Sequence, residues 1–340
     1  MLDNQINSQT NNVLEEINHN LLAFKELAAR VFHGRGHFFA GFEHLNIEWY
    51  PPYLFVQNFK EQLDSQIAAI LESIFNRHTF IEAIFVQTRT WPELSTSIFT
   101  QRSPCELPIV KWAALTPELS CQITLGKNRN TGVFLDMRAG WHWAQANAQN
   151  KKVLNLFSYT SIFSLFALQG GANNVVNMDM AAGVLKTAQR NHQQNGLSDG
   201  KAAFYKRDIL KSAQQFSRMG PYDLIIIDPP PYQKKSFRGW LDYEKLLDRC
   251  HACLTPNGCL FVCLNNPQVS LQEFIIRLQN KFPSATKVEN IETADEIKEK
   301  DPQGYALLES FLPPMMHGYE SLIDPNFRGT FSLQFNEELP

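Results

Sequence analysis

The first third of the chain combines one helical apolar pattern with short extended runs. Apolar residues from Val13 to Phe32 recur at helical spacing, which predicts one long amphipathic helix. The pattern then predicts strands over residues 46–49, 53–58 and 83–87 and a helix over residues 62–75. Pro51 and Pro52 mark the turn between the first two strands. This order of elements predicts a small α+β domain.

From residue 151 the pattern changes to short, continuous apolar runs that alternate with helical segments. The runs occupy residues 153–157, 175–178, 202–205, 224–227 and 259–264, with helical segments over 163–169 and 181–195. This alternation is typical of βαβ units, whose parallel strands are buried on both faces. Such crossovers are right-handed, so we predict a doubly wound, Rossmann-like α/β sheet. We place the smaller α+β domain at residues 1–125 and the sheet domain at residues 126–340.

Composition and charge exclude several classes of protein. The chain has 340 residues, of which 44% are hydrophobic, as in an ordinary globular protein. Its net charge of −3 argues against non-specific coating of nucleic acid, although it permits a local basic face. No stretch reaches the roughly 18 apolar residues of a membrane helix, and the N-terminus does not resemble a secretory signal. Six cysteines suggest no disulfide framework, so we expect a cytoplasmic protein with reduced thiols and no membrane association.

Polar residues follow the first three predicted strands, at the edge where a doubly wound sheet binds ligands. After the first strand come Phe157, Ser158, Tyr159, Thr160 and Ser161. This turn has no glycine and matches the phosphate-binding fingerprint poorly, which disfavours NAD and FAD. Asp179 follows the second strand and could accept hydrogen bonds from ribose hydroxyls, while Asp208 follows the third and could accept from an adenine amino group. S-adenosylmethionine (SAM) is a nucleoside cofactor without phosphates that suits this arrangement.

The fourth strand is followed by a proline-rich loop. Its residues are Asp228, Pro229, Pro230, Pro231 and Tyr232. Prolines fix φ and carry no N–H, so the loop presents carbonyl acceptors in a stiff geometry. Asp228 could accept a hydrogen bond from a base, and Tyr232 or Phe237 could stack on a flipped base. The alternative is a proline-rich turn with an aromatic residue packed at the sheet edge.

Two further clusters are ambiguous. Lys234, Lys235 and Arg238, beside Phe237 and Trp240, could hold RNA phosphates or could form an ordinary solvated loop. Lys127 and Arg129 could extend the same basic face.

Cys250 and Cys253 have metal-like spacing, but no second pair follows at zinc spacing. We therefore expect these two cysteines to pack in a helix, and we expect no metal.

Three sequence motifs carry a family resemblance. They are Thr131-Gly-Val-Phe-Leu-Asp-Met-Arg138, Val153-Leu-Asn-Leu-Phe-Ser-Tyr-Thr160 and Asp223-Leu-Ile-Ile-Ile-Asp-Pro-Pro230, with Asn177-Met-Asp179 between the last two. In combination they resemble the ribosomal RNA large-subunit methyltransferases, a family that includes a cytosine-C5 enzyme and a guanine methyltransferase module. The resemblance spans roughly residues 30 to 280 and implies a class I, Rossmann-like, SAM-dependent methyltransferase.

The resemblance also implies roles for individual residues. Phe157, Ser158 and Thr160 would line the methionine end of SAM, Asp179 would hold its ribose and Asp208 its adenine. Asp136 and Arg138 would lie close to the cofactor. The cofactor-binding candidates also include Tyr159, Met180 and Ile209. Asp228 and Pro229 would face the target, and Pro230 and Tyr232 complete the catalytic candidates.

Three departures from the family pattern affect the expected chemistry. Ser161 stands where the family usually has glycine. The RNA-binding PUA module of some members is expected to be absent. The nucleophilic cysteine of the cytosine-C5 branch aligns with Asn265, whereas Cys263 lies two residues earlier. Carbon-5 of cytosine needs a thiolate nucleophile but a nitrogen does not, so methylation of a guanine nitrogen is favoured, with covalent catalysis by Cys263 as the alternative.

The expected function is methylation of a base in RNA, with 23S ribosomal RNA as the substrate and RNA as the partner. The α+β region at residues 1–125 would help to bind that substrate. Two other interpretations stay open at this point: a methyltransferase for a small molecule or protein, and a SAM-binding protein without turnover. The sequence is compatible with a homodimer.

Overall fold

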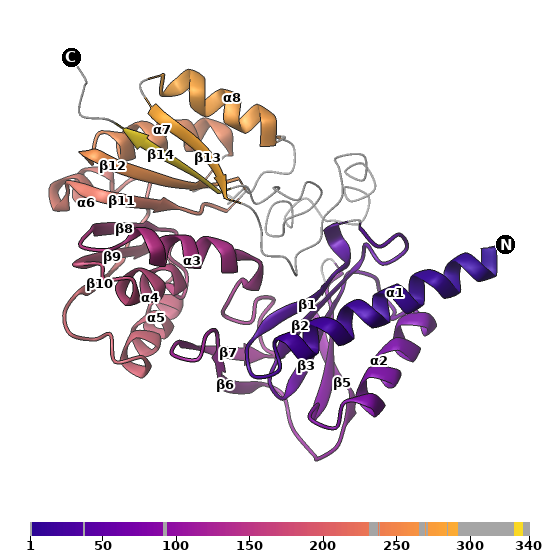
Figure 1. Ribbon diagram of the computed structural model, residues 1–340. Coiled ribbons are helices and arrows are strands. Elements are labelled where there is room, and N and C mark those ends of the chain that lie inside the picture. The colour runs from indigo at the N-terminus through magenta and orange to yellow at the C-terminus, as the bar shows by residue number, and fades with distance from the viewer. Residues whose placement is uncertain are drawn as a thin grey trace. The chain divides into compact units, whose positions relative to one another are not determined.

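The computed structural model describes residues 2–36, 38–90, 94–230, 237, 239–264, 269, 271–283, 285–291 and 330–335. The described residues form two compact units, which divide between Asp136 and Met137 (Figure 1). This division lies later in the chain than the domain boundary expected after residue 125. No helix among the described residues is long and apolar enough to cross a membrane.

The N-terminal unit is built on a five-stranded sheet in the order β1-β2-β3-β4-β5. Its elements are α1 (Leu2–Ala23), β1 (Ala29–His33), β2 (Leu45–Tyr50), β3 (Tyr53–Asn58), α2 (Ser65–Arg77), β4 (Ala83–Thr88), β5 (Ser95–Gln101) and the hairpin β6 (Ile109–Ala114) and β7 (Ser120–Leu125). Apolar side chains of α1 and α2 pack with every second residue of the central strands, such as Ile47 and Val56. The α+β composition and strands β2, β3 and β4 agree with the sequence prediction.

The prediction of one helix from Val13 to Phe32 was wrong at its C-terminal end. Helix α1 ends at Ala23, and Ala29–His33 forms the edge strand β1. All five residues of β1 are buried, and the strand pairs antiparallel with β2. Sheet pairing and burial therefore override a helical spacing of apolar residues that a strand can also satisfy.

The C-terminal unit contains a seven-stranded sheet in the order β10-β9-β8-β11-β12-β14-β13. Its elements are α3 (Arg138–Asn147), β8 (Lys152–Leu156), α4 (Ile162–Gln169), β9 (Asn174–Asp179), α5 (Ala182–Gln194), β10 (Ala202–Lys206), α6 (Ala213–Met219), β11 (Tyr222–Ile227), α7 (Trp240–His251), β12 (Leu254–Cys263), α8 (Leu271–Lys281), β13 (Ala285–Ile291) and β14 (Thr330–Phe335). Strands β8 to β12 are parallel, which confirms the doubly wound sheet. The sheet is nevertheless mixed, because β14 pairs antiparallel with both β12 and β13.

Helices cover both faces of this sheet (Figure 1). One face packs against α6, α7 and α8 through residues such as Phe216, Leu246 and Phe274. On the opposite face, the Phe261 ring contacts Trp143 of α3 and Phe163 of α4. The crossover connections of consecutive parallel strands require this two-sided arrangement, which leaves the carboxyl ends of the strands available for ligands.

A chain of buried polar side chains joins the sheet to α4 and α5. The Nδ2 of Asn155 donates to the Oδ1 of Asn177 over 3.0 Å, and the Nδ2 of Asn177 donates to the Oγ of Ser164 over 3.1 Å. The Ser164 hydroxyl lies 2.9 Å from the Nε2 of His192, whose Nδ1 lies 2.8 Å from the Ala188 carbonyl oxygen. The carbonyl can only accept, so Nδ1 carries the proton and Nε2 accepts from Ser164. The chain is therefore satisfied with a neutral imidazole.

We expect this chain to make stability depend on pH. Burial lowers the pKa of His192 from its ordinary value of 6.5, so the folded state binds this proton less readily than the unfolded state. The stabilisation is thus present above pH 6.5 and is lost as the pH falls below it. Urea unfolding as a function of pH should show a steeper acid-side loss for the wild type than for His192→Gln. Equal pH dependence of the two proteins would contradict this assignment.

Candidate functional site

The parallel register brings the carboxyl ends of the central strands to one level. Leu156 of β8 pairs with Met178 of β9 and with Ile227 of β11. The residues that follow these three are Phe157, Asp179 and Asp228, respectively. The structure therefore brings together residues of three sequence motifs that lie far apart in the chain, at the edge where open α/β sheets bind ligands.

The segment Phe157–Ser161, which we name the β8–α4 loop, has an unusual backbone. Phe157, Tyr159 and Ser161 have positive φ angles of 56°, 48° and 61°. Residues other than glycine seldom adopt this region, because the Cβ atom crowds the backbone. Such strain persists only where surrounding contacts determine the conformation, and it is concentrated at functional sites.

Contacts from two neighbouring elements hold this loop. The Ser158 N–H donates to the Met178 carbonyl over 3.0 Å, and the Tyr159 N–H donates to the Oδ2 of Asp179 over 2.9 Å. From α5, the Nδ2 of Asn191 donates to the Thr160 carbonyl over 3.1 Å. Sequence reasoning did not identify Asn191, because no local signal shows which loop a buried helix residue will contact.

Two hydroxyl groups of the loop are buried without a partner among the described residues. They belong to Ser158 and Ser161, whose exposed fractions are 7% and 0%. A buried hydroxyl without a hydrogen bond costs roughly 1–3 kcal/mol, so native proteins usually satisfy it. A polar ligand group beside the loop would supply the missing partners. The loop therefore fits the polar methionine end of SAM.

We expect Ser161→Gly to stabilise the C-terminal unit by about 1 kcal/mol. Glycine adopts the left-handed conformation without the Cβ penalty, and the substitution removes a buried hydroxyl that lacks a partner. The greater entropy of the unfolded glycine chain offsets part of this gain. Urea unfolding would measure the change. Ser217→Gly within α6 is the matched control and should destabilise the unit; a destabilised Ser161→Gly would contradict the strain argument.

Asp179 both organises the loop and could bind a ligand. Its Oδ2 accepts the Tyr159 N–H, and its Oδ1 accepts the Ala181 N–H over 2.9 Å. Burial raises the pKa of its carboxyl group, and these backbone hydrogen bonds partly oppose that shift. Each carboxylate oxygen can accept a second hydrogen bond, which leaves capacity for two hydroxyl groups of a ribose.

Asp208 lies beyond the neighbouring strand β10. Lys206 of β10 pairs with Asp179, and Asp208 follows two residues later. Its Oδ2 forms an ion pair with the Nζ of Lys211 at 3.2 Å. The two apolar candidates that follow these acids differ in exposure, since Met180 is 39% exposed whereas Ile209 is 2% exposed. The edge thus offers two carboxylates, each followed by an apolar residue, and binding of the adenosine moiety of SAM by these residues stays a prediction.

Asp228 begins the proline-rich loop at the end of β11. Pro229 is buried, whereas Asp228 and Pro230 are partly exposed. Burial, with a smaller contribution from the neighbouring Cys263 and Asp228 groups, raises the pKa of Tyr243. The Tyr243 hydroxyl is therefore protonated at neutral pH, and it donates to the Cys263 carbonyl over 2.8 Å. Asp228 therefore supplies a carboxyl group at the carboxyl end of β11.

Several predicted candidates lie outside the described residues. They are Pro231, Tyr232, Lys234, Lys235, Arg238 and Asn265. Phe237 is described, and its proposed role in stacking on a base was wrong. Its side chain is 2% exposed, and its ring packs against Phe157 at 5.6 Å and against Tyr243 at 6.1 Å. Phe237 is therefore a core residue.

The cysteines that the sequence analysis considered, Cys250, Cys253 and Cys263, are all buried. Cys250 and Cys253 are buried, and the Sγ of Cys253 lies 3.0 Å from the Arg249 carbonyl and 3.1 Å from the Oγ of Ser217. Ile227 pairs with Val262, so Cys263 is level with Asp228 on the neighbouring strand. Its side chain is fully buried. Within the described part of the chain, no group of three potential metal ligands occurs.

The two charged residues of the 131–138 motif belong to different units. Asp136 lies in the N-terminal unit, where its Oδ2 is 3.4 Å from the Nη1 of Arg30. In the same unit, the Thr131 hydroxyl is 2.7 Å from the hydroxyl of Tyr50. Arg138 begins α3 of the C-terminal unit and is buried. Proximity of Asp136 and Arg138 to the cofactor stays a prediction.

Comparison with known proteins places these features in a family context. Residues 29–311 match the family model for S-adenosylmethionine-dependent methyltransferases. Similar proteins include ribosomal RNA large subunit methyltransferase I of Aeromonas hydrophila, 31% identical over 45% of this chain and 40% of that protein. Ribosomal RNA large subunit methyltransferase K/L of Alteromonas mediterranea is 36% identical over 52% of this chain and 24% of that protein. The aligned region thus covers less than half the length of these relatives.

Solved structures show the same fold. A SAM-dependent methyltransferase from Streptococcus mutans has a TM-score of 0.75 at 19% identity, covering 97% of this chain and 81% of that one. A methyltransferase structure with the same score, identity and coverage is a complex with S-adenosylhomocysteine (SAH). A complex of aTrm5 with tRNALeu has a TM-score of 0.53 at 11% identity, covering 85% and 72% of the two chains. These likenesses confirm the Rossmann-like methyltransferase fold.

Proposed function

Because this chain belongs to the S-adenosylmethionine-dependent methyltransferase family, we propose that it methylates a base in RNA, with 23S ribosomal RNA as substrate. The observation that carries the cofactor assignment is the level arrangement of the β8–α4 loop, Asp179 and Asp228 at one sheet edge. The names of the ribosomal RNA methyltransferase relatives support the substrate class. The fold shared with a tRNA-bound methyltransferase is compatible with it. A ribosomal RNA substrate also implies action in the cytoplasm.

The proposed cofactor contacts follow from the described geometry. The Ser158 and Ser161 hydroxyls, which lack partners, would bind polar groups at the methionine end, beside Phe157 and Thr160. Asp179 would accept both ribose hydroxyls. Asp208 would accept the adenine amino group, and the adenine ring would lie between Met180 and Ile209.

The proposed chemistry is direct transfer to a nitrogen. SAM supplies an electrophilic methyl group when bound. A guanine nitrogen attacks the methyl group with its own electron pair, and a nitrogen that carries a hydrogen gives up that proton. The transfer therefore needs no covalent enzyme intermediate and depends mainly on position and orientation. Asp228 would accept a hydrogen bond from the base and hold the nitrogen toward the methyl group. The adjacent Pro229 and Pro230 would keep this acceptor in place because proline fixes φ.

The buried state of Cys263 favours nitrogen over carbon-5 as the target. A reactive cysteine is normally a partly exposed thiolate in an electropositive environment, whereas Cys263 is fully buried at the end of β12. It also lies level with Asp228, not beyond it. The N-terminal unit, whose compact part ends at Asp136, would bind the RNA substrate.

We expect Asp179→Ala to weaken SAM binding by about 30- to 100-fold, which removal of two charge-assisted hydrogen bonds would produce. Isothermal titration with SAM is the measurement. Asp199→Ala removes an exposed carboxylate from the loop before β10 and is the matched control, with wild-type affinity expected. Wild-type affinity in Asp179→Ala would exclude it from the ribose site.

The substrate proposal is tested by methyl transfer from radiolabelled SAM. Unmodified 23S RNA, transfer RNA, free nucleosides and total protein would be compared as acceptors, and the modified nucleoside would be identified by mass spectrometry. A methylated guanosine in 23S RNA, formed equally by wild type and Cys263→Ala, is the expected result. A 5-methylcytidine that disappears with Cys263→Ala would establish the covalent route, and methylation of protein alone would refute the RNA proposal.

A further inference from the structure

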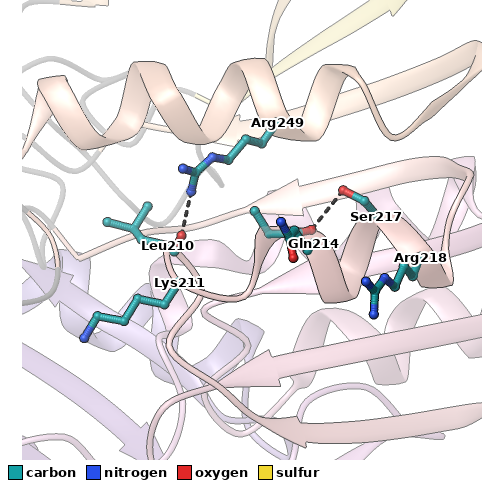
Figure 2. A pocket seen from close by; sticks show the side chains of 7 residues that line it. Leu210, Lys211, Gln214, Ser217, Arg218 and Arg249 are labelled. Atoms are coloured by element: carbon teal, nitrogen blue, oxygen red, sulfur yellow. Dashed lines mark hydrogen bonds between the residues drawn. The ribbon is translucent and has the colours of Figure 1, made fainter.

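A basic pocket lies between α6 and α7 on one flank of the C-terminal unit. It has a volume of about 700 Å³ and is lined by residues of the α6 segment and by Arg249 of α7. Figure 2 shows Lys211 and Arg218 near opposite ends of the α6 segment, with Arg249 reaching from α7 toward Leu210. None of the residues assigned to the cofactor or to the target base lines the pocket, although Lys211 of the lining pairs with Asp208.

The lining is positively charged, and only one of its cations, Lys211, has a carboxylate partner among the described residues. Lys211, Arg218 and Arg249 contribute charge, and no lining residue is acidic. The Nη1 of Arg249 donates to the Leu210 carbonyl over 2.6 Å, which positions the guanidinium without neutralising it. Lys211 pairs with Asp208 but is 79% exposed. Among the described residues, the Arg218 guanidinium has no carboxylate partner within ion-pair distance.

This local charge contrasts with the rest of the chain. Residues 206–218 contain four cations, Lys206, Arg207, Lys211 and Arg218, and the single carboxylate Asp208, whereas the whole chain has a net charge of −3. The pocket is thus a local concentration of positive charge, which would attract an anionic partner to one place on the surface.

The pocket begins close to the proposed active site. Leu210 follows Asp208 by two residues, so one end of the pocket adjoins the carboxyl edge of the sheet. Strand β10 is separated from β11, which carries Asp228, by β9 and β8. Three strand spacings correspond to about 14 Å between the carboxyl ends of β10 and β11. Helix α6 then leads back to the start of β11 at Tyr222, so Arg218 lies at the end of the pocket farther from Asp228, and several nucleotides of single-stranded RNA would connect the two.

We propose that the α6–α7 pocket binds backbone phosphates of the RNA that flank the target base; this rests on the proposed RNA methyltransferase function. Arginine guanidinium groups match phosphate oxygens with paired hydrogen bonds, and lysine adds a point charge. The side-chain amide of the exposed Gln214 supplies a neutral donor at the same surface. Such contacts set the position of the RNA without reading its sequence.

The test compares Arg218 variants in RNA binding and methylation. Arg218 is exposed, so Arg218→Gln and Arg218→Glu should fold, and unchanged SAM affinity would verify this. The matched control is Lys186→Glu on α5, an exposed cation on the helix layer that covers the opposite face. Binding of unmodified 23S RNA would be measured over a series of salt concentrations.

For Arg218→Gln we expect a several-fold loss of RNA affinity and a salt slope reduced by about 0.7–0.9, the value for one lost phosphate contact. Arg218→Glu should lose more affinity, with a raised KM for RNA and a largely unchanged kcat, while Lys186→Glu should match the wild type. Wild-type affinity and slope in both Arg218 variants would overturn the pocket assignment alone. Failure of the wild type to bind and methylate RNA would overturn the proposed function, and the pocket assignment with it.

Discussion

Asp228→Asn is expected to slow methyl transfer by about 10²- to 10⁴-fold, with SAM affinity preserved. Asparagine keeps the shape of the side chain and one acceptor oxygen, but it removes the negative charge that would hold the base N–H and accept its proton. Under the proposed function, the position of Asp228 at the end of β11, level with the β8–α4 loop, would put this charge beside the target base. Single-turnover transfer to saturating 23S RNA measures the chemical step separately from RNA binding.

Asp248→Asn is the matched control for this substitution. Asp248 lies on α7, is 62% exposed and pairs with Lys281, so its loss should leave the transfer rate unchanged. A rate for Asp228→Asn within threefold of the wild type, with the same methylated product, would show that Asp228 has a structural role in its loop.

Arg30→Ala should destabilise the N-terminal unit by about 3–5 kcal/mol. The Nη2 of Arg30 lies 2.9 Å from the Oε1 of Glu48, and both side chains are 2% exposed. Its Nη1 also lies 3.4 Å from Asp136. Removal of the guanidinium would leave two buried carboxylates without this cation. The Tyr50 hydroxyl, which donates to Glu48 over 2.8 Å, satisfies only one of their oxygens.

Urea unfolding followed by hydrogen exchange of the backbone amides of β2 and β3 would report on this unit. Lys60→Ala provides the comparison, because the Lys60–Asp64 pair is exposed and should contribute less than about 1 kcal/mol. If Arg30→Ala lowers the free energy of unfolding no more than Lys60→Ala does, the attraction between Arg30 and Glu48 only offsets the cost of burying the two charges.

Much of the C-terminal sheet could be predicted from the sequence because its strands are buried on both faces. Such strands appear as continuous apolar runs, and Leu224 to Ile227 is a clear example. The sequence also predicted that Asp179 and Asp228, directly after such runs, lie at one edge of the sheet, and the parallel register confirms that they do. Strand β14 was not predicted, because its pairing with β12 joins segments far apart in the chain and leaves no local signal.

The supporting contacts of the site were less accessible to sequence analysis. The hydrogen bond from Asn191 to Thr160 depends on how α5 packs on the sheet, which periodicity does not determine. The same is true of the buried chain from Asn155 to His192. The motif at residues 131–138 was recognised as one unit of sequence, although its buried contacts through Thr131 and Asp136 lie in the N-terminal unit.

The ion pair between Arg30 and Asp136 has a consequence for dissection of the chain. A C-terminal fragment that begins at residue 126 would carry Thr131 and Asp136 without Tyr50 and Arg30, their partners in the intact protein. The first residues of that fragment would thus include two polar side chains that have lost these partners. A fragment that begins at Met137 leaves residues 126–136 with the N-terminal unit, where Thr131 and Asp136 have their partners, and it starts the C-terminal unit just before the first turn of α3.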